Sequence, residues 1–224
     1  KKQIRIERIH MEEDTAKQFH KETGTYIDFN RAGTPLIEIV SKPDMHSAKE
    51  AAAYVETLRK NLLYLNVSDV KMEEGSMRCD VNISLSKDKD TLGTKTEIKN
   101  LNSIANVQKA VQAEIERQSA LLDAGEKVEQ ATRRYDEAQK TTILMRKKEG
   151  NVDYKYFPEP NIFPIQLDLD WVKSIQDNLE ELPDARLARF MKDYELSEYD
   201  ASVLVADREM ADFFEEVLKS TKFA

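Results

Sequence analysis

Carboxylates gather at the ends and on the faces of segments whose pattern predicts β-strands. They are Glu12, Glu13, Asp14, Glu38, Glu73, Glu74, Asp80 and Glu97. A group of acids without matching bases needs a cation. Oxygen ligands suit Mg²⁺, which takes one or two protein carboxylates and leaves its other positions to water and phosphate. The pattern favours phosphoryl transfer, although in a chain with 42 acidic residues most of these acids can also be solvated strand ends.

Glu38 is the acid that least resembles a solvated strand end. It lies between Ile37 and Ile39 in the apolar segment 36–40. An ionised group buried there is costly unless it is paired or bound to metal. A metal-binding role and a structural role are both open for this residue.

Other reactive residues give weaker signals. Cys79 is the single cysteine, so the chain cannot build an internal disulfide framework, and with three histidines a closed zinc site is not expected. A nucleophilic Cys79 would need a histidine partner, and neither His20 nor His46 lies in a recognisable motif, so a buried thiol is favoured. His10 receives no role. The glycine-rich phosphate-binding loops of P-loop and Rossmann proteins are absent from the sequence.

The net charge of −8 argues against a broad basic surface for nucleic acid. Any RNA contact must be local, and the short basic patches 133–134 and 146–148 are candidates that can equally be solvated faces. No apolar run approaches the roughly 20 residues of a membrane span, and the first residues do not resemble a signal peptide. A reducing compartment is expected.

Strands come first among the elements that must position these residues. Alternating or β-prone runs predict strands at residues 4–11, 26–29, 36–40, 67–72, 78–85, 94–99, 128–135 and 141–146. The polar turn 73–76 predicts a hairpin between the two strands that flank it. In the segment 78–85, polar residues alternate with apolar ones, so Arg78, Asp80 and Asn82 should share one face.

Helices are predicted between and after these strands. The segment 47–50 reads as a capping box that starts a helix, and Asn102 or Ser103 caps a longer one that ends at Gly125. After a proline-containing loop at 153–160, helices are expected at 170–179, 183–194, 197–205 and 207–219. We therefore predict an α+β fold with a boundary near residue 181. We also expect sequence to be missing before the first strand and the helical part to be truncated at Ala224.

The segment 28–44, DFNRAGTPLIEIVSKPD, closely resembles the signature of the B subunits of tRNA-dependent amidotransferases. The blocks 10–14, 71–82, 97–103 and 153–160 resemble further blocks of this family, in family order. The resemblance implies a cradle domain, with a mainly antiparallel sheet like that of the glutamine synthetase catalytic domain, over residues 1–180. A helical, tRNA-contacting domain would start at 181–224.

The resemblance also implies a reaction. B subunits use ATP and Mg²⁺ to phosphorylate the side-chain carboxylate of misacylated Glu-tRNA(Gln) or Asp-tRNA(Asn). Ammonia then displaces the phosphate; a glutaminase A subunit supplies it, and a small C subunit completes the heterotrimer. A fragment without part of its metal shell is not expected to act alone. The alternative from another class is a non-catalytic scaffold of the same fold that docks tRNA or subunits.

Carried over residue by residue, the resemblance places metal ligands at Glu13 and Glu38, with further ligands from an N-terminal strand outside this chain. It places phosphate or second-metal contacts at Arg78, Asp80 and Lys99. The chain departs from the family at 15–16, where Thr-Ala replaces a common Ala-Gly, and at 86–87, where Ser-Lys replaces Arg-Pro. Contacts expected from those two loops are therefore in doubt.

Overall fold

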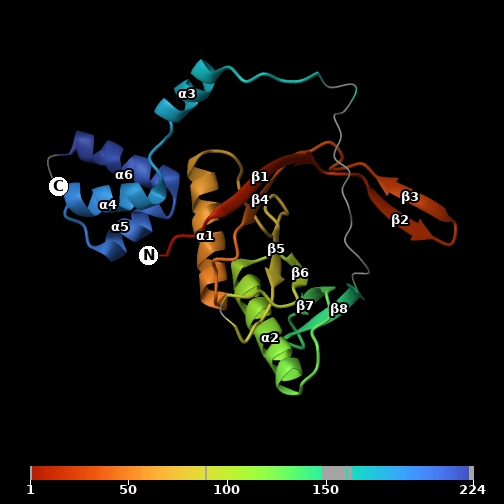
Figure 1. The fold of residues 1–224 in the computed structure, drawn as a ribbon. Helices are drawn as coiled ribbons and strands as arrows, with labels where there is room; N and C mark the ends of the chain where they lie inside the picture. Colours follow the sequence, from red (N-terminus) through yellow and green to blue (C-terminus); the bar gives the residue numbers. More distant parts are fainter. Residues whose placement is uncertain (1, 89, 148–159, 161–162, 222–224) are drawn as a thin grey trace. The chain divides into compact units, whose positions relative to one another are not determined.

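The computed structural model describes residues 2–88, 90–147, 160 and 163–221. Strands and helices mix along the chain, and most strand pairs are antiparallel, so the predicted α+β class is confirmed (Figure 1). The contacts divide the chain into two units, residues 1–50 and 51–224, and each is described by itself. The predicted boundary near residue 181 stays a prediction.

The first unit is built from two antiparallel strand pairs. Strand β1 (Ile6–Glu13) pairs with β4 (Pro35–Ser41), and β2 (Lys17–Lys21) pairs with β3 (Gly24–Asp28). Because β2 and β3 lie between β1 and β4 in the sequence, their hairpin extends from the end of the β1–β4 ribbon (Figure 1). Strand β2 was not predicted, because its lysines, glutamine and histidine carry no apolar alternation.

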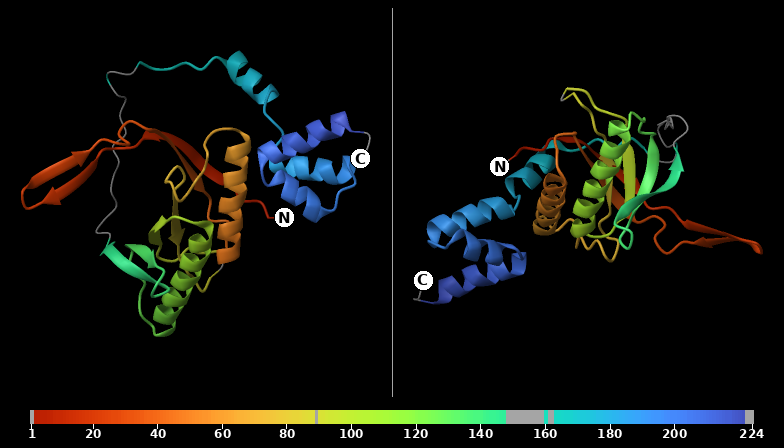
Figure 2. Two further views of the ribbon diagram at one scale, coloured as in Figure 1. Left: turned by 180° about the vertical axis from the view of Figure 1, so that it is seen from behind. Right: turned by 90° about the horizontal axis from the view of Figure 1, so that it is seen from below.

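The second unit contains a sheet of order β5-β6-β7-β8. Its strands are β5 (Cys79–Ile83), β6 (Thr96–Leu101), β7 (Ala131–Asp136) and β8 (Thr141–Lys147). Strands β6 and β7 are parallel, because helix α2 (Ile104–Asp123) connects them as a crossover. Helix α2 lies along one face of the sheet, as the views in Figures 1 and 2 agree.

The core of this unit forms between the sheet, α2 and helix α1 (Ala48–Tyr64). Ile98, Val107 and Ala110 are fully buried there, and Val55 from α1 packs against them. The apolar residues of β5 face this core, while the alternate residues of the strand are exposed. The polar face predicted for this strand is therefore confirmed for Asp80 and Asn82.

Four helices follow the sheet in the sequence, at the positions that were predicted. They are α3 (Leu169–Asp177), α4 (Pro183–Asp193), α5 (Glu198–Val205) and α6 (Arg208–Ser220). Phe190, Ala201 and Ala211 form a second buried cluster. Tyr64, at the end of α1, is 1% exposed within that cluster and donates a 2.8 Å hydrogen bond to the carbonyl oxygen of Val205.

The predicted strand 67–72 and its hairpin with 78–85 are wrong. Asn66 and Val70 have positive φ angles of 54° and 45°, which interrupts an extended backbone. Side chains of Ser68 and Ser76 accept hydrogen bonds from the backbone N–H groups of Val70 and Lys71 and hold the segment as turns. The partner of β5 is instead β6, which follows it after the connection 84–95.

Candidate active site

Glu13 and Glu38 both lie on the β1–β4 ribbon, but not side by side. Glu13 pairs across the strands with Pro35, whereas Glu38 pairs with His10. The two acids are thus three residue positions apart, about 10 Å along the strands, and strand alternation points them to opposite faces. The register does not bring the two predicted ligands together on one ion.

Glu38 is half-exposed, contrary to the burial that its apolar neighbours predicted. Its side chain is 47% exposed and accepts a 3.2 Å hydrogen bond from Arg8, so this carboxylate is neither buried nor without a charged partner. A position between two isoleucines predicted burial, but a two-stranded ribbon leaves both of its faces open. The burial cost that the sequence predicted for Glu38 therefore does not arise, and its role as a metal ligand stays a prediction.

Several of the acids have basic partners, contrary to the expectation that they gather without bases. Asp14 accepts a 2.8 Å hydrogen bond from Arg31, and Glu74 pairs with Lys71 at 3.1 Å. These partners lie 17 and 3 residues away in the sequence, respectively, and the longer separation is not visible in a strand pattern. The number of acids by itself is therefore weak evidence for a bound cation.

The open face of the second unit's sheet carries a cation held between two acids. The ammonium group of Lys99 on β6 lies 3.1 Å from Asp80 Oδ2 on β5 and 3.3 Å from Glu97 Oε1. Burial by itself would lower the pKa of Lys99, but the hydrogen bond and negative charge of Asp80, with those of Glu97, raise it above its ordinary value. Lys99 is thus a fixed positive charge with a defined position.

Further polar groups share this face. Thr132 on β7 donates a 3.2 Å hydrogen bond to Glu97, and Arg134 lies beside Lys99 in the register of β6 and β7. Arg78 precedes β5 by one residue and is exposed. The structure thus brings together Asp80 and Lys99, and it adds Arg134, which the sequence marked only as part of a basic patch.

The predicted Mg²⁺ can be tested against these side chains. Within the part of the chain that the structure describes, no group of three or more His, Cys, Asp or Glu side chains is placed to hold a metal ion. Mg²⁺ needs only one or two protein carboxylates, so Glu13 or Glu38 fits as a single ligand. As a pair on one ion they do not fit, because they point to opposite faces.

A buried polar network behind the sheet was not foreseen. Glu114 of α2 is 0% exposed and accepts hydrogen bonds from Arg117, Gln118 and Thr142. Burial by itself would raise the pKa of Glu114, but these hydrogen bonds hold it below its ordinary value. A signal was available, because Glu114 and Gln118 continue the helical spacing of the buried residues Val107 and Val111. The network ties α2 to β8 and so fixes the sheet that carries Lys99.

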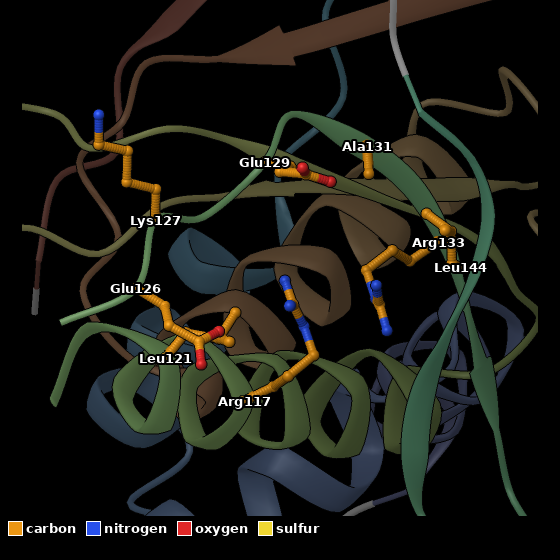
Figure 3. Close-up of a pocket in the computed structure, with 8 residues that line it drawn as sticks. All are labelled: Arg117, Leu121, Glu126, Lys127, Glu129, Ala131, Arg133 and Leu144. Carbon is orange, nitrogen blue, oxygen red and sulfur yellow. The ribbon is translucent and has the colours of Figure 1, made fainter. Parts of the chain in front are cut away.

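A hollow of about 240 Å³ opens between the C-terminal half of α2 and strands β7 and β8 (Figure 3). Its lining mixes three basic, two acidic and three apolar residues: Arg117, Lys127, Arg133, Glu126, Glu129, Leu121, Ala131 and Leu144. None of the predicted site residues lines it, and its two arginines already serve Glu114. It is therefore distinct from the polar face around Lys99.

The remaining candidates have structural settings. Burial raises the pKa of the Cys79 thiol to about 12, so the expected unreactive thiol is supported. The aromatic loop 153–160 lies outside the described residues, except for Pro160. Within the described ranges, the helices are all too short or too polar to cross a membrane.

Comparisons with known proteins agree on one family. The sequence model described as "GatB/GatE catalytic domain" matches residues 1–173. The chain is 55% identical over 218 residues to the B subunit of the aspartyl/glutamyl-tRNA(Asn/Gln) amidotransferase from Oceanobacillus iheyensis, covering 96% of this chain and 46% of the relative. The corresponding B subunits from Mycoplasma capricolum and Enterococcus faecalis are 54% and 52% identical, over 99% and 97% of this chain and 46% of each relative. The chain thus spans about half the length of these relatives.

Proposed function

Because this chain belongs to the GatB/GatE catalytic-domain family, we propose that it is the activating part of a tRNA-dependent amidotransferase. It converts Glu on tRNA(Gln), Asp on tRNA(Asn), or both, into the corresponding amide. Residues 1–180 form a cradle domain related to that of glutamine synthetase, and residues 181–224 begin a helical domain that contacts tRNA. The names of the relatives support this substrate class.

The proposed reaction has two steps. A side-chain carboxylate oxygen of the aminoacyl group attacks the γ-phosphorus of ATP, the bond to ADP breaks, and an acyl phosphate forms. Ammonia then attacks the acyl carbon, the carbon–oxygen bond to phosphate breaks, and the nitrogen loses a proton to give the amide. Both substrates of the first step are anions, so charge repulsion is the main obstacle that the protein must offset.

The observation that carries the proposal is the Lys99 ammonium held between Asp80 and Glu97. A lysine positioned by two carboxylates on an open sheet face is a fixed cation for phosphate oxygens. Arg134 lies beside it in the register of β6 and β7, with Asp136 3.9 Å from its guanidinium group, and the exposed Arg78 next to β5 is a further candidate for phosphate contact. Asp80 and Glu97 act as positioning residues in this proposal, since they orient and charge Lys99.

Mg²⁺ and ATP are the proposed cofactors. When bound, Mg²⁺ supplies positive charge to the phosphate oxygens. Glu13 and Glu38 can each give one ligand oxygen, and the remaining ligands come from water, phosphate or protein outside these residues. Arg8 contacts Oε1 of Glu38, so the other carboxylate oxygen, Oε2, is the one proposed to bind the metal.

The proposed assembly follows the family. A glutaminase A subunit produces the ammonia and a small C subunit completes a heterotrimer in the bacterial cytoplasm or an organellar matrix. The activity belongs to that assembly, and this chain by itself is not proposed to catalyse the reaction.

The test uses the reconstituted full-length heterotrimer with Glu-tRNA(Gln), ATP and ammonium chloride, so that glutamine hydrolysis is bypassed. ADP release and amide formation are measured for wild type, Lys99→Met, Glu13→Ala and Glu38→Ala. Lys60→Met is the matched control, because Lys60 pairs with Glu56 on the surface of α1. We expect Lys99→Met to lower kcat about 100-fold or more, as loss of one transition-state donor does, while Lys60→Met leaves it unchanged.

Normal rates in Lys99→Met would show that Lys99 does not contribute to the reaction, and the proposal would lose its main support. Normal rates in both glutamate variants would refute their role as metal ligands but leave that of Lys99 intact. tRNA binding is measured in parallel, so that a loss of rate with tRNA affinity retained can be assigned to activation.

A second function is supported by the ion pairs of the acids. If Arg8, Arg31 and Lys71 neutralise these carboxylates for structural reasons, the chain is a non-catalytic scaffold that docks tRNA or subunits. A scaffold should bind its partners equally well with Mg²⁺ and with EDTA and should give no ATP turnover in the intact assembly. A Mg²⁺-dependent release of ADP would exclude it.

A further inference from the structure

The β2–β3 hairpin is the most exposed element of the first unit. All ten of its strand residues are exposed, and its two strands form a sheet of their own. An isolated two-stranded hairpin is marginally stable in water. Its side chains are therefore available for contacts with another molecule, and such contacts would also stabilise it.

One face of this hairpin combines aromatic rings with lysines. Phe19 and Tyr26 are directly opposed across the strands and are 41% and 52% exposed. The ammonium group of Lys17 lies 4.9 Å from the centre of the Phe19 ring, and that of Lys21 lies 5.1 Å from the centre of the Tyr26 ring. Two opposed rings, each with a lysine ammonium group over it, thus share one face of the hairpin, which we call the ring face.

The charges of the ring face suit an anion. Asp28, the acid opposite Lys17, accepts a hydrogen bond from the backbone N–H of Asn30 at the base of the hairpin. Glu22 lies in the turn rather than on a strand. The ring face therefore carries two lysines within about 5 Å of the rings and one acid, Asp28, which is already hydrogen-bonded, on a chain whose net charge is −8.

The opposite face of the same hairpin has a different chemistry. It carries Gln18, His20, Thr25 and Ile27, and the His20 ring is hydrogen-bonded to the Thr25 hydroxyl at 3.0 Å. This face has one aliphatic side chain, one partnered imidazole and no aromatic carbocycle. The two faces therefore provide an internal comparison within one element.

We propose that the ring face of the β2–β3 hairpin binds unpaired nucleotides of RNA, with bases stacked on Phe19 and Tyr26 and phosphates near Lys17 and Lys21. Aromatic side chains on strands that stack single-stranded bases, with lysines along the backbone, are a general solution for binding unpaired nucleic acid. The choice of RNA among polyanions rests on the proposed function, whose substrate is a tRNA.

Two properties favour RNA over a protein partner. A protein interface usually buries apolar side chains in a pocket and depletes lysine at its centre, whereas here the lysines lie against the rings. In addition, the two rings are directly opposed across the strands and are 41% and 52% exposed, so each offers aromatic surface to a base.

The experiment measures binding of a fluorescein-labelled, unstructured ten-nucleotide RNA to the 224-residue chain by fluorescence anisotropy. The ring variant is Phe19→Leu with Tyr26→Leu, which keeps apolar bulk in the strands but removes the rings. The control variant is Gln18→Ala with Ile27→Ala, on the other face. A duplex RNA of the same length serves as the competitor without unpaired bases.

We expect the ring variant to weaken binding at least about 30-fold, because each stacked base contributes roughly 5- to 150-fold. The control variant should bind as wild type, and the duplex should compete poorly. Replacing Lys17 and Lys21 by Met should reduce the slope of log K against log salt by about 1.4, at about 0.7 for each phosphate contact.

Three results would overturn the inference: wild-type affinity in the ring variant, an equal loss in the control variant, or equal competition by duplex. The second of these is the result expected if the substitutions act by disrupting the hairpin as a whole, and the first is the result expected if the hairpin docks a protein instead. The Lys99→Met assay in the heterotrimer decides the proposed function separately, because Lys99 lies in the other unit. A hairpin that fails to bind RNA, in an enzyme that still needs Lys99, would refute only the inference.

Discussion

Glu114 offers a direct test of how the sheet behind Lys99 is held. The carboxylate is 0% exposed and accepts hydrogen bonds of 2.6 to 2.9 Å from Arg117, Gln118 and Thr142. Replacing Glu114 by Ala removes the acceptor of all these donors at once. The packing of α2 on the sheet should then loosen at two strands. Thr142 on β8 loses its acceptor, and Gln118, which also hydrogen-bonds Thr96 on β6, loses one of its own.

The size of the effect follows from the burial of the partners. Removing one member of a buried ion pair costs about 3–5 kcal/mol, because the other charge is left uncompensated. The side chains of Arg117 and Arg133 are 23% and 15% exposed, so water can hydrate them once the carboxylate is removed. We therefore expect the lower end, about 3 kcal/mol, for Glu114→Ala. Glu114→Gln keeps one acceptor oxygen and should cost about 2 kcal/mol.

Urea unfolding followed by far-UV circular dichroism measures these free energies. Glu116→Ala is the matched control, because Glu116 lies on the exposed side of α2 and pairs only locally with Gln112 at 2.9 Å; it should change stability by less than about 0.5 kcal/mol. A Glu114→Ala protein within about 1 kcal/mol of wild type would refute the argument that this network holds α2 on the sheet.

The pH dependence of the unfolding free energy tests whether the charged form of Glu114 stabilises the fold. The folded state holds the pKa of Glu114 below its ordinary value of 4.5, so its stabilising contribution is present above about pH 4.5 and is lost as pH falls through the folded pKa. The stability difference between wild type and Glu114→Gln should therefore shrink from pH 6 towards pH 3. A difference that grew on acidification would contradict the direction of the shift.

Three further predictions concern the second unit. Tyr64→Phe removes the hydrogen bond to the carbonyl oxygen of Val205 and should cost about 1 kcal/mol in urea unfolding; no change would mean that water replaces it. Because burial raises the pKa of Cys79 from 9.0 to about 12, its thiolate fraction at pH 8 should be roughly a thousandth of normal, and iodoacetamide should label it correspondingly slowly. Hydrogen bonds, chiefly from Arg189, lower the pKa of Glu215 to about 2, so its contribution is present above pH 4.5 and lost towards pH 2. In acid titrations, Glu215→Gln should be less stable than wild type at pH 6 and converge with it near pH 2, and parallel curves would contradict this.

Local patterns in the sequence determined the helices and the polar face of β5. Ser47 accepts a hydrogen bond from Glu50 N–H at the start of α1, as the capping box requires, although Glu50 accepts in return from His46 N–H rather than from Ser47. Ser103 caps α2, and Gly125 follows its end with a φ of 77°. These features depend on residues within one or two turns, so a single chain segment contains the physical information they need.

The family signature at 28–44 also lies in one contiguous segment, and the comparisons with known proteins agree with the family that it indicates. Two further blocks, 71–82 and 97–103, contain Asp80 and Lys99, whose side chains the structure places 3.1 Å apart. The roles of Glu13 and Glu38 remain predictions, and the pattern could not tell that strand register would point them to opposite faces.

Only the tertiary structure decided which strands pair and which charges meet. The segment 67–72 has β-prone residues, yet serine side chains and two positive φ angles fold it into turns, and β5 pairs with β6 instead. Arg8 neutralises Glu38, which lies 30 residues further along the chain. Strand register and long-range ion pairs depend on the folding of the whole chain, because each contact competes with every other partner that the same groups could find. The sequence therefore determined the helices and most of the strands, and the tertiary structure determined which strands pair and that Lys99 is held between Asp80 and Glu97 on the face where the chemistry is proposed.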